Sequence, residues 1–203
     1  MNSQTTLTYS LTTSTINIPA DTNLTYVAFL KKGWRETQKL QFNFTGENST
    51  LNFIALILGL GEETFPFETI SNHEIPHTNA YYNIRGVMFD KSQVYYRGSL
   101  NIKKSAQLTD CYLAHHTLML SKNAKTHTIP SLEIEADDVK AGHAATIGKV
   151  DEDILFYLAS RGINKKQGQS MLIKGFLETD LKKISDPNIQ LILAKNIEEA
   201  LQC

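Results

Sequence analysis

Residues 111–143 hold most of the histidine and cysteine side chains of this sequence, which could bind a metal. Four of the six histidines fall in this stretch, together with Cys111, one of the two cysteines of the chain. Thiolate and imidazole groups are good ligands for transition metals. The supply of thiolates is thin, because the second cysteine is Cys203, far along the chain. The residue types alone therefore permit a metal site here without specifying one.

A second group of reactive side chains consists of Glu133, Glu135, Asp137 and Asp138. Two carboxylates that face a groove can act as general acid and general base, as in polysaccharide lyases and glycosidases. However, Glu133 and Glu135 alternate with apolar residues, which places them together on one face of a strand. We favour a solvated strand face for these two residues, and a turn formed by Asp137 and Asp138. A carbohydrate-active enzyme stays as the weakest of three functional hypotheses.

Motifs and composition argue against two other function classes. The segment Gly59-Leu60-Gly61 lacks the third glycine and the GK[ST] ending of phosphate-binding loops, so nucleotide hydrolysis has to come from another protein. The chain has 20 basic and 21 acidic residues and a formal net charge of −1. Such a balance offers no field that would attract nucleic acid or anionic lipid.

The sequence predicts neither a signal peptide nor a membrane span. The first twenty residues are rich in Thr and Ser and contain no basic start followed by an apolar run. No later window reaches the roughly 20 apolar residues that cross a bilayer. Two cysteines cannot form a disulfide framework. We therefore expect a cytoplasmic protein.

Apolar residues that alternate with polar ones predict β-strands from about Thr15 to Ile134. The runs recur at a spacing of roughly 8 to 12 residues, which is compatible with a sandwich, a barrel or a solenoid. No strict repeat is visible, so the period alone does not choose between these folds. The clearest runs are Leu40-Phe42-Phe44, Leu51-Phe53, Val94-Tyr96, Leu100-Ile102 and Leu132-Ile134.

The apolar period changes to a helical one after Val150. Asp151 suits the N-cap of a first helix, and Gly162 can adopt the left-handed conformation that ends it. A second helix is expected from about Asn164, and Asp186-Pro187 opens a third. We expect residues 1–150 to form a β core and residues 151–203 a helical region packed on the end of that core. The expected buried stripes are Met171, Leu172, Phe176 and Leu177 in the second helix, and Ile189, Ile192, Leu193 and Ile197 in the third.

The segment 130–163, PSLEIEADDVKAGHAATIGKVDEDILFYLASRGI, resembles the C-terminal core of the SufB/SufD family of iron–sulfur cluster assembly proteins. SufD-type members carry Pro-x-Leu-Glu-Ile-x-Ala-Asp-Asp-Val-Lys, then Cys-Ser-His, and then a Phe-Tyr-Leu-x-Ser-Arg-Gly-Ile helix. The resemblance covers about residues 76–180. The matching residues are Pro130, 132–134, 136–140, His143, Ala145, Thr146, 156–158 and 160–163.

The resemblance implies a mainly β fold, a right-handed parallel β-helix with a C-terminal helical region. It also implies a non-enzymatic, SufD-like subunit that pairs with a SufB-type partner or with itself through the solenoid edge. Family members are usually longer, with an N-terminal helical region and more coils, so we expect a shortened version. Whether the first forty residues join the first coil or fold over it is left open.

In the family, a SufC-type ABC ATPase docks on the C-terminal helices, which correspond here to residues 151–180. The residues expected to face this ATPase are Tyr157, Arg161 and Lys165. A cysteine desulfurase system would act indirectly by supplying sulfur. Four apolar residues are expected to pack the helices against the solenoid instead, namely Phe156, Leu158, Phe176 and Leu177.

The resemblance also suggests ligands for a transient iron–sulfur cluster shared with a partner. The cysteine of the SufD pattern falls on Ala141, which leaves His143 in an exposed turn, and the acidic residue that follows this histidine in SufB falls on Ala144. A SufB-type cysteine position matches His115, so His115 and His143 could share a metal if adjacent coils stack them. Cys111 is a further candidate without a counterpart in the family pattern.

Two alternatives to cluster chemistry stay open. His115, His116 and His127 could be wall residues of the solenoid that form ordinary hydrogen bonds. The missing cysteine and acidic neighbour also permit a metal-free interaction protein, a solenoid whose edges serve assembly alone.

Overall fold

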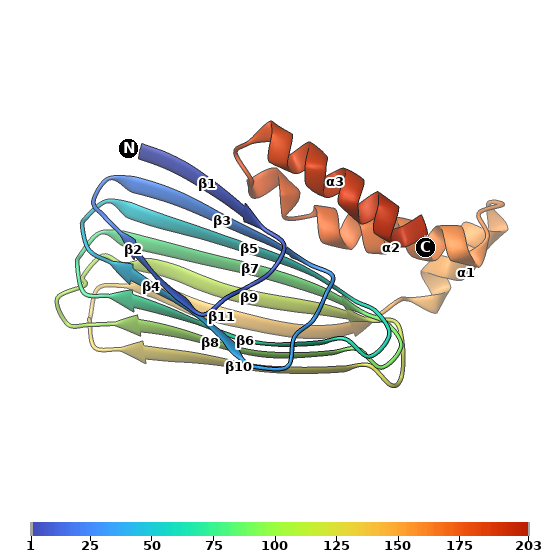
Figure 1. The fold of residues 1–203 in the computed structure, drawn as a ribbon, viewed down its shortest axis with the longest axis horizontal. Helices are drawn as coiled ribbons and strands as arrows, with labels where there is room; N and C mark the ends of the chain where they lie inside the picture. The colour runs from blue at the N-terminus through green and yellow to red at the C-terminus, as the bar shows by residue number, and fades with distance from the viewer. Residues whose placement is uncertain (1, 203) are drawn as a thin grey trace.

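The computed structural model describes residues 2–202 and shows a parallel β-helix with helices on one of its faces (Figure 1). Within these residues, eleven strands form two sheets, and neighbouring strands in each sheet are parallel. We call them sheet A and sheet B. Sheet A contains, in spatial order, β1 (Asn2–Thr8), β3 (Thr22–Leu30), β5 (Ser49–Gly59), β7 (Thr78–Met88), β9 (Asp110–Met119) and β11 (Lys140–Lys149). Sheet B contains β10 (Lys125–Ile134), β8 (Gln93–Ile102), β6 (Thr64–His73), β4 (Gln38–Phe44) and β2 (Ser14–Ile18).

Along most strands, apolar side chains at every second position face inward and form the core between the two sheets. Residues such as Phe53 in β5 and Val94 in β8 face inward and are fully buried. Because parallel neighbours cannot be joined by a hairpin, the chain must pass from one sheet to the other between strands of the same sheet. The predicted strands and the solenoid are therefore confirmed. The repeat is hidden in the sequence because the coils differ in length: Asn2 pairs with Thr22, whereas Asn79 pairs with Asp110.

A ladder of asparagines holds the register of sheet B on its outer face. The side-chain amides of Asn43, Asn72 and Asn101 each donate to the side-chain oxygen of the asparagine one coil before, at 3.1, 2.9 and 2.9 Å. The ladder begins at Asn17. In-register stacking of identical amides satisfies each group by its neighbour, so a slip by one residue would break every bond of the ladder.

The two ends of the solenoid differ in polarity. At the N-terminal end, the core-facing positions of β1 are polar, for example Gln4 and Thr6, and they cover the first coil as a polar cap. Residues 2–40 therefore belong to the first coils of the solenoid and do not fold over it. At the C-terminal end, β10 and β11 leave Ile134 43% and Ile147 63% exposed. This end has an apolar, uncovered edge.

The helical region consists of α1 (Glu152–Ser160), α2 (Lys165–Glu178), the 3-10 turn η1 (Leu181–Lys183) and α3 (Pro187–Gln202). The predicted helix ends are confirmed. Asp151 accepts a hydrogen bond from the amide of Asp153 at 2.9 Å, and Gly162 has a φ of 85°. Asn164 forms a capping box at the start of α2. No helix within residues 2–202 is long and apolar enough to span a bilayer.

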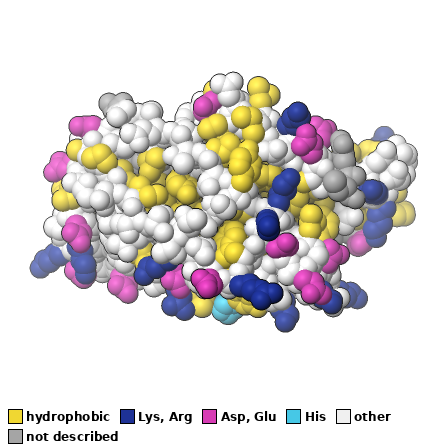
Figure 2. All heavy atoms as spheres, in the orientation of Figure 1, with side chains coloured by type: hydrophobic (Ala, Val, Ile, Leu, Met, Phe, Trp, Pro, Cys, Tyr) yellow, Lys and Arg dark blue, Asp and Glu magenta, His cyan; other side chains and the backbone are white. Residues whose placement is uncertain are grey.

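The helices α2 and α3 pack on the outer face of sheet A, not on the end of the solenoid as predicted (Figure 1). The outward positions of β3, β5 and β7 are apolar here, so this part of the sheet is buried on both faces. Figure 2 shows hydrophobic side chains gathered near the middle of the visible face. The buried contacts are made by Val27, Phe29, Ile54, Leu56, Leu58 and Val87 of the sheet with Ile173, Leu177, Leu181, Ile184, Leu193 and Ile197 of the helical layer.

The predicted stripes of α2 and α3 are wrong in part. Met171 is 54% exposed, and Ile173 takes its place on the buried face of α2. In α3, Leu193 and Ile197 are buried, whereas Ile192 is 44% exposed. The apolar residues of each helix cover more than one face, and docking on the sheet selects the face that becomes buried.

An ion cluster fastens the helical layer to the sheet. The Asp180 carboxylate is buried and lies 2.6 Å from Nε of Arg85 in β7 and 2.7 Å from Nζ of Lys183. The Arg85 guanidinium also lies over the Phe176 ring, 4.9 Å from its centre. A buried carboxylate needs such partners, because an unpaired buried charge is costly.

We predict that truncating the buried face of α2 destabilises the fold much more than truncating its exposed face. Leu177→Ala should lower the free energy of unfolding by about 2–4 kcal/mol, because it leaves a cavity between α2 and sheet A. Met171→Ala, in the same helix, should change it by less than about 0.5 kcal/mol. Urea unfolding monitored by circular dichroism measures both values, and equal effects would contradict the observed docking of α2.

Candidate functional site

The three candidate metal ligands do not come together in the structure. Cys111 and His115 face the core from β9, and both are almost fully buried. His143 is exposed on β11. In the register of the two strands, His143 pairs with Leu113 and His115 pairs with Ala145, so adjacent coils do not stack the two histidines. Among residues 2–202 there is no group of three or more His, Cys, Asp or Glu side chains that could hold a metal ion.

His115 is tied into the solenoid interior by hydrogen bonds at both ring nitrogens. Its Nδ1 lies 2.6 Å from the Thr128 hydroxyl and its Nε2 lies 3.2 Å from the Thr117 hydroxyl. The ring packs edge to face with Tyr96. Burial, with a smaller contribution from His116, lowers the pKa of His115 to about 4. These contacts agree with the alternative interpretation, in which His115 is a wall residue of the solenoid that forms ordinary hydrogen bonds.

The other two wall histidines lie on outer faces. His116 is half-buried on sheet A, and its Nδ1 lies 2.7 Å from the Thr146 hydroxyl. His127 lies on sheet B next to Tyr95, with 6.4 Å between the ring centres. Neither faces the solenoid interior.

Cys111 is held in the core as a neutral thiol. Burial, with a smaller contribution from Asp110, raises its pKa to about 12. A thiol binds metal as the thiolate, so this environment does not favour ligation. The register pairs Cys111 with Ala141, the position of the family cysteine. The Cys111 sulfur thus lies one coil before Ala141, the position at which the SufD pattern has its cysteine.

His143 lies on a strand, not in an exposed turn as predicted. β11 pairs with β9 along its whole length, and its other backbone edge has no neighbouring strand among the described residues. The segment was not recognised as a strand because it is rich in Ala and Gly, which have low strand propensity. His143 therefore belongs to the uncovered C-terminal edge of the solenoid, beside the half-buried Ala141.

The acidic residues near this edge are arranged as predicted for a solvated strand face and a turn. Glu133 is exposed on β10. Glu135 pairs with Lys103, with 2.7 Å between the carboxylate oxygen and Nζ. Asp137 and Asp138 lie in the bend between β10 and β11, where the amide of Asp138 donates to the side chain of Gln107.

Helix α1 exposes a set of large side chains on the helical region. Phe156 is 77% exposed, so the prediction that it packs the helices against the solenoid is wrong. Ile154 and Tyr157 are also exposed. Leu155 packs α1 against α2, since it and Leu158 contact the position of Gly168 in α2. We call Ile154, Phe156, Tyr157 and Met171 the helical apolar set.

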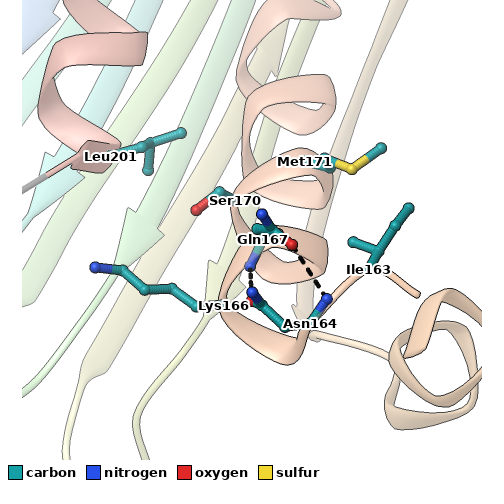
Figure 3. A pocket seen from close by; sticks show the side chains of 7 residues that line it. All are labelled: Ile163, Asn164, Lys166, Gln167, Ser170, Met171 and Leu201. Atoms are coloured by element: carbon teal, nitrogen blue, oxygen red, sulfur yellow. Dashed lines mark hydrogen bonds between the residues drawn. The ribbon is translucent and has the colours of Figure 1, made fainter.

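Charged residues and a groove accompany the helical apolar set. Arg161 and Lys165 are exposed as predicted; the Arg161 guanidinium lies 5.4 Å from the centre of the Tyr157 ring, and Lys165 pairs with Glu152. A groove of about 650 Å³ lies where the start of α2 faces the end of α3. Figure 3 shows Ile163 and Met171 on one side of α2, with Leu201 of α3 across from it.

Comparisons with known proteins agree with the sequence resemblance. Residues 1–176 match the family model described as "SUF system FeS cluster assembly, SufBD core domain". The chain is similar to the iron–sulfur cluster assembly protein SufD of Escherichia coli, at 34% identity over 162 residues, which cover 79% of this chain and 38% of that protein. It is similar to SufD of Bacillus subtilis at 32% identity over 160 residues, covering 79% of this chain and 37% of the relative. An iron–sulfur cluster assembly SufBD family protein of Methanothermobacter thermautotrophicus is 31% identical over 139 residues, covering 68% of this chain and 33% of the relative. The chain thus spans well under half the length of these curated relatives.

The buried histidines predict loss of stability in mild acid. Burial lowers the pKa of His73 to about 3 and that of His115 to about 4, from an ordinary value of 6.5. Each ring therefore takes up a proton more readily in the unfolded chain. The free energy of unfolding should fall as the pH drops below about 6.5, and should continue to fall to about pH 4 for His115 and about pH 3 for His73.

Urea unfolding at several pH values between about 7.5 and 5 measures this dependence. His115→Gln should make it shallower, because glutamine keeps a hydrogen-bonding group but does not titrate. An unchanged pH dependence in this variant would mean that His115 is not held neutral in the folded protein.

Proposed function

Because this chain belongs to the SufB/SufD family of iron–sulfur cluster assembly proteins, we propose that it is a non-enzymatic, SufD-like scaffold subunit. It would pair through one end of its solenoid with a SufB-type partner or a second copy, and bind an ABC-type ATPase through its helices. The observation that carries this proposal is the uncovered apolar edge of β10 and β11, on which His143 lies.

The polarity of the two ends supports pairing at the C-terminal end. The edges of β10 and β11 have backbone groups that another strand can bind, and the neighbouring Ile134 and Ile147 offer apolar contact. Proteins usually protect such edges with charge, proline or a covering element. The opposite end has the polar cap of β1 and offers less apolar surface.

His143 is the residue of this edge best suited to bind a cluster. An exposed imidazole can complete the coordination of an iron–sulfur cluster, with thiolates as the main ligands. Ala141 and Ala144 supply neither sulfur nor carboxylate, so the partner would contribute the cysteine or glutamate ligands. The cluster would be cargo assembled between two proteins and passed on.

The helical apolar set supports the docking of an ATPase. An exposed Phe beside an exposed Tyr and an Arg has the composition that dominates binding energy at protein interfaces. The buried layer between α2, α3 and sheet A would transmit ATP-driven movement of the helices to the solenoid. Closure of two ATPase subunits would then move the paired solenoids and open the cluster edge.

A metal-free interaction protein is the second candidate. It is favoured by the absence of any group of three metal-binding side chains within residues 2–202. In this case the same edge would serve assembly alone, and His143 would be an ordinary interface residue.

We predict that His143→Ala loses the cluster but keeps the complex. The chain would be copurified with its SufB-type partner and ATPase, and reconstituted without oxygen with iron and sulfide. The variant should lose most of the cluster absorbance, because one ligand is missing, while gel filtration shows the same complex. His127→Ala, which alters a histidine on the outer face of sheet B, is the control and should keep the cluster.

Unchanged iron and sulfide in His143→Ala would remove this residue from the mechanism. A metal-free complex of the unaltered proteins would support the second candidate.

We further predict that Phe156→Ala weakens ATPase binding by about tenfold or more, since truncating a central interface aromatic costs at least about 1.4 kcal/mol. Leu191→Ala is the control, because Leu191 is nearly as exposed as Phe156 but lies on α3. Calorimetric titration with the ATPase measures both affinities. If Phe156→Ala binds as tightly as the unaltered chain, the docking surface lies elsewhere.

A further inference from the structure

A polar groove lies on the outer face of sheet A, and its lining residues belong neither to the edge strands β10 and β11 nor to the helical apolar set. It has a volume of about 570 Å³ and runs along β7 and β9 beside η1. It is lined at one end by Tyr81 and Tyr112 and at the other by Arg85, His116 and Lys183. Neither the cluster edge nor the ATPase surface uses these side chains.

Small residues create the hollow of the polar groove. Ala114 lines its floor, and its partner in β11 is Ala144. Gly142 pairs with Tyr112, and a Cβ atom at Gly142 would lie only 3.1 Å from the Tyr112 ring. The ring thus packs closely on the backbone of β11, which only glycine permits without displacement. Larger residues at these positions would fill the space.

The two tyrosines form the aromatic end of the polar groove. Tyr81 and Tyr112 are paired in register on β7 and β9, and Tyr112 is 45% exposed. An exposed aromatic side chain on a rigid strand is a platform on which planar rings stack, and each such contact is worth about 1–3 kcal/mol.

The other end of the polar groove is cationic. Arg85 and His116 are paired in register four residues further along the same strands, roughly 13 Å from the tyrosines. Nζ of Lys183 lies 2.6 Å from the Asn83 side-chain oxygen. Asp180 neutralises one of the two permanent cations, so this end keeps an excess of one positive charge.

His116 can add to this positive charge when an anion arrives. Its Nδ1 is bound to Thr146, and Nε2 has no hydrogen-bond partner in the described part of the chain. Partial burial, with Arg85 and Lys183, lowers the pKa of His116, while Asp180 opposes this effect. A bound dianion would offset the repulsion between His116 and the cations Arg85 and Lys183, and would favour the protonated ring. The protonated ring would then donate a hydrogen bond to the dianion.

The ion cluster explains Arg85 and Asp180 as a fastening of the helical layer, but it does not explain the hollow or the tyrosines. Lys183 is half exposed, and its ammonium group has three donors, of which the hydrogen bond to Asn83 uses one. The Asp180 carboxylate, 2.7 Å away, is its ion-pair partner. The groove volume lies within the range of small-molecule sites, about 300–1,000 Å³.

We propose that the polar groove binds a phosphate monoester that carries a planar ring, of the size of a nucleoside monophosphate. The phosphate lies among Lys183, His116 and Arg85, and the ring stacks at Tyr112. A ligand with these two groups at opposite ends matches both ends of the groove, whereas inorganic phosphate or a free nucleoside matches only one.

Calorimetric titrations of the chain with adenosine 5′-monophosphate, adenosine and inorganic phosphate test the proposal. The monophosphate should bind saturably and more tightly than either of the other two probes. Lys183→Met should weaken its binding by about tenfold or more, as expected for loss of a charge-assisted contact. Lys182→Met is the matched control, because Lys182 is the exposed neighbour in η1 that does not line the groove, and it should leave the affinity unchanged.

Tyr112→Leu tests the aromatic end. It should weaken binding of the monophosphate and the nucleoside but not of inorganic phosphate, whereas Tyr95→Leu, on sheet B, should change none of the three. Proton NMR of His116 should show its pKa rise when the monophosphate binds. Unfolding midpoints of all variants separate a folding defect from a binding defect. The proposal is overturned if the unaltered chain shows no saturable binding below about 5 mM, or if Lys183→Met and Lys182→Met bind equally well.

Discussion

In-register parallel stacking is the constraint on which the other features of this molecule depend. Each residue lies beside its counterpart in the neighbouring coil, at a spacing of about 4.8 Å. A position that faces inward in one coil therefore faces inward in the next, as Leu51, Ala80 and Cys111 do in sheet A. The same stacking aligns the asparagine ladder of sheet B and brings Tyr81 next to Tyr112. Residues about thirty positions apart become neighbours, so the side chains that act together come from different coils.

The helical layer depends on a local exception to the usual alternation. In β5, consecutive residues from Phe53 to Leu58 are all buried, because one set faces the core and the other faces α2 and α3. This apolar run is the reason that the helices lie on the sheet. The polar groove begins on the same face where the outward positions become polar, at Tyr81 and Asn83. The buried Asp180 marks the boundary, since its ion pairs with Arg85 and Lys183 require the helical layer to sit in one position.

Local features of the sequence predicted the elements well, whereas features that depend on the neighbouring coil could not be predicted from it. Strand alternation and the caps at Asp151, Asn164 and Asp186 are encoded within a few residues, and the structure has them.

Strand β11 was missed because its Ala-rich segment is a strand only through pairing with β9. Phe156 was assigned to the packing layer because hydrophobicity alone does not tell an exposed side chain from a buried one. The polar groove joins residues of β7, β9 and η1 across about one hundred positions, and the sequence gives no signal of this.

In the proposed function, the position of His143 would link the pairing of the solenoid to its cluster chemistry. On any inner strand, a residue at this register is covered by the next coil, as Leu113 is covered in β9. His143 is accessible only because no described strand follows β11, so a partner strand that binds this edge lies directly beside the imidazole. Pairing would remove water and lower the local dielectric, and an imidazole without a hydrogen-bond partner would then favour metal ligation or a hydrogen bond across the interface. If a cluster is bound, both partners contribute cluster ligands and strand contacts at the same surface. Any movement that separates the two strands then also opens the coordination shell of the cluster. In the metal-free model the same movement would break a hydrogen bond alone. The two models therefore share one interface and differ in whether iron and sulfide accompany its formation.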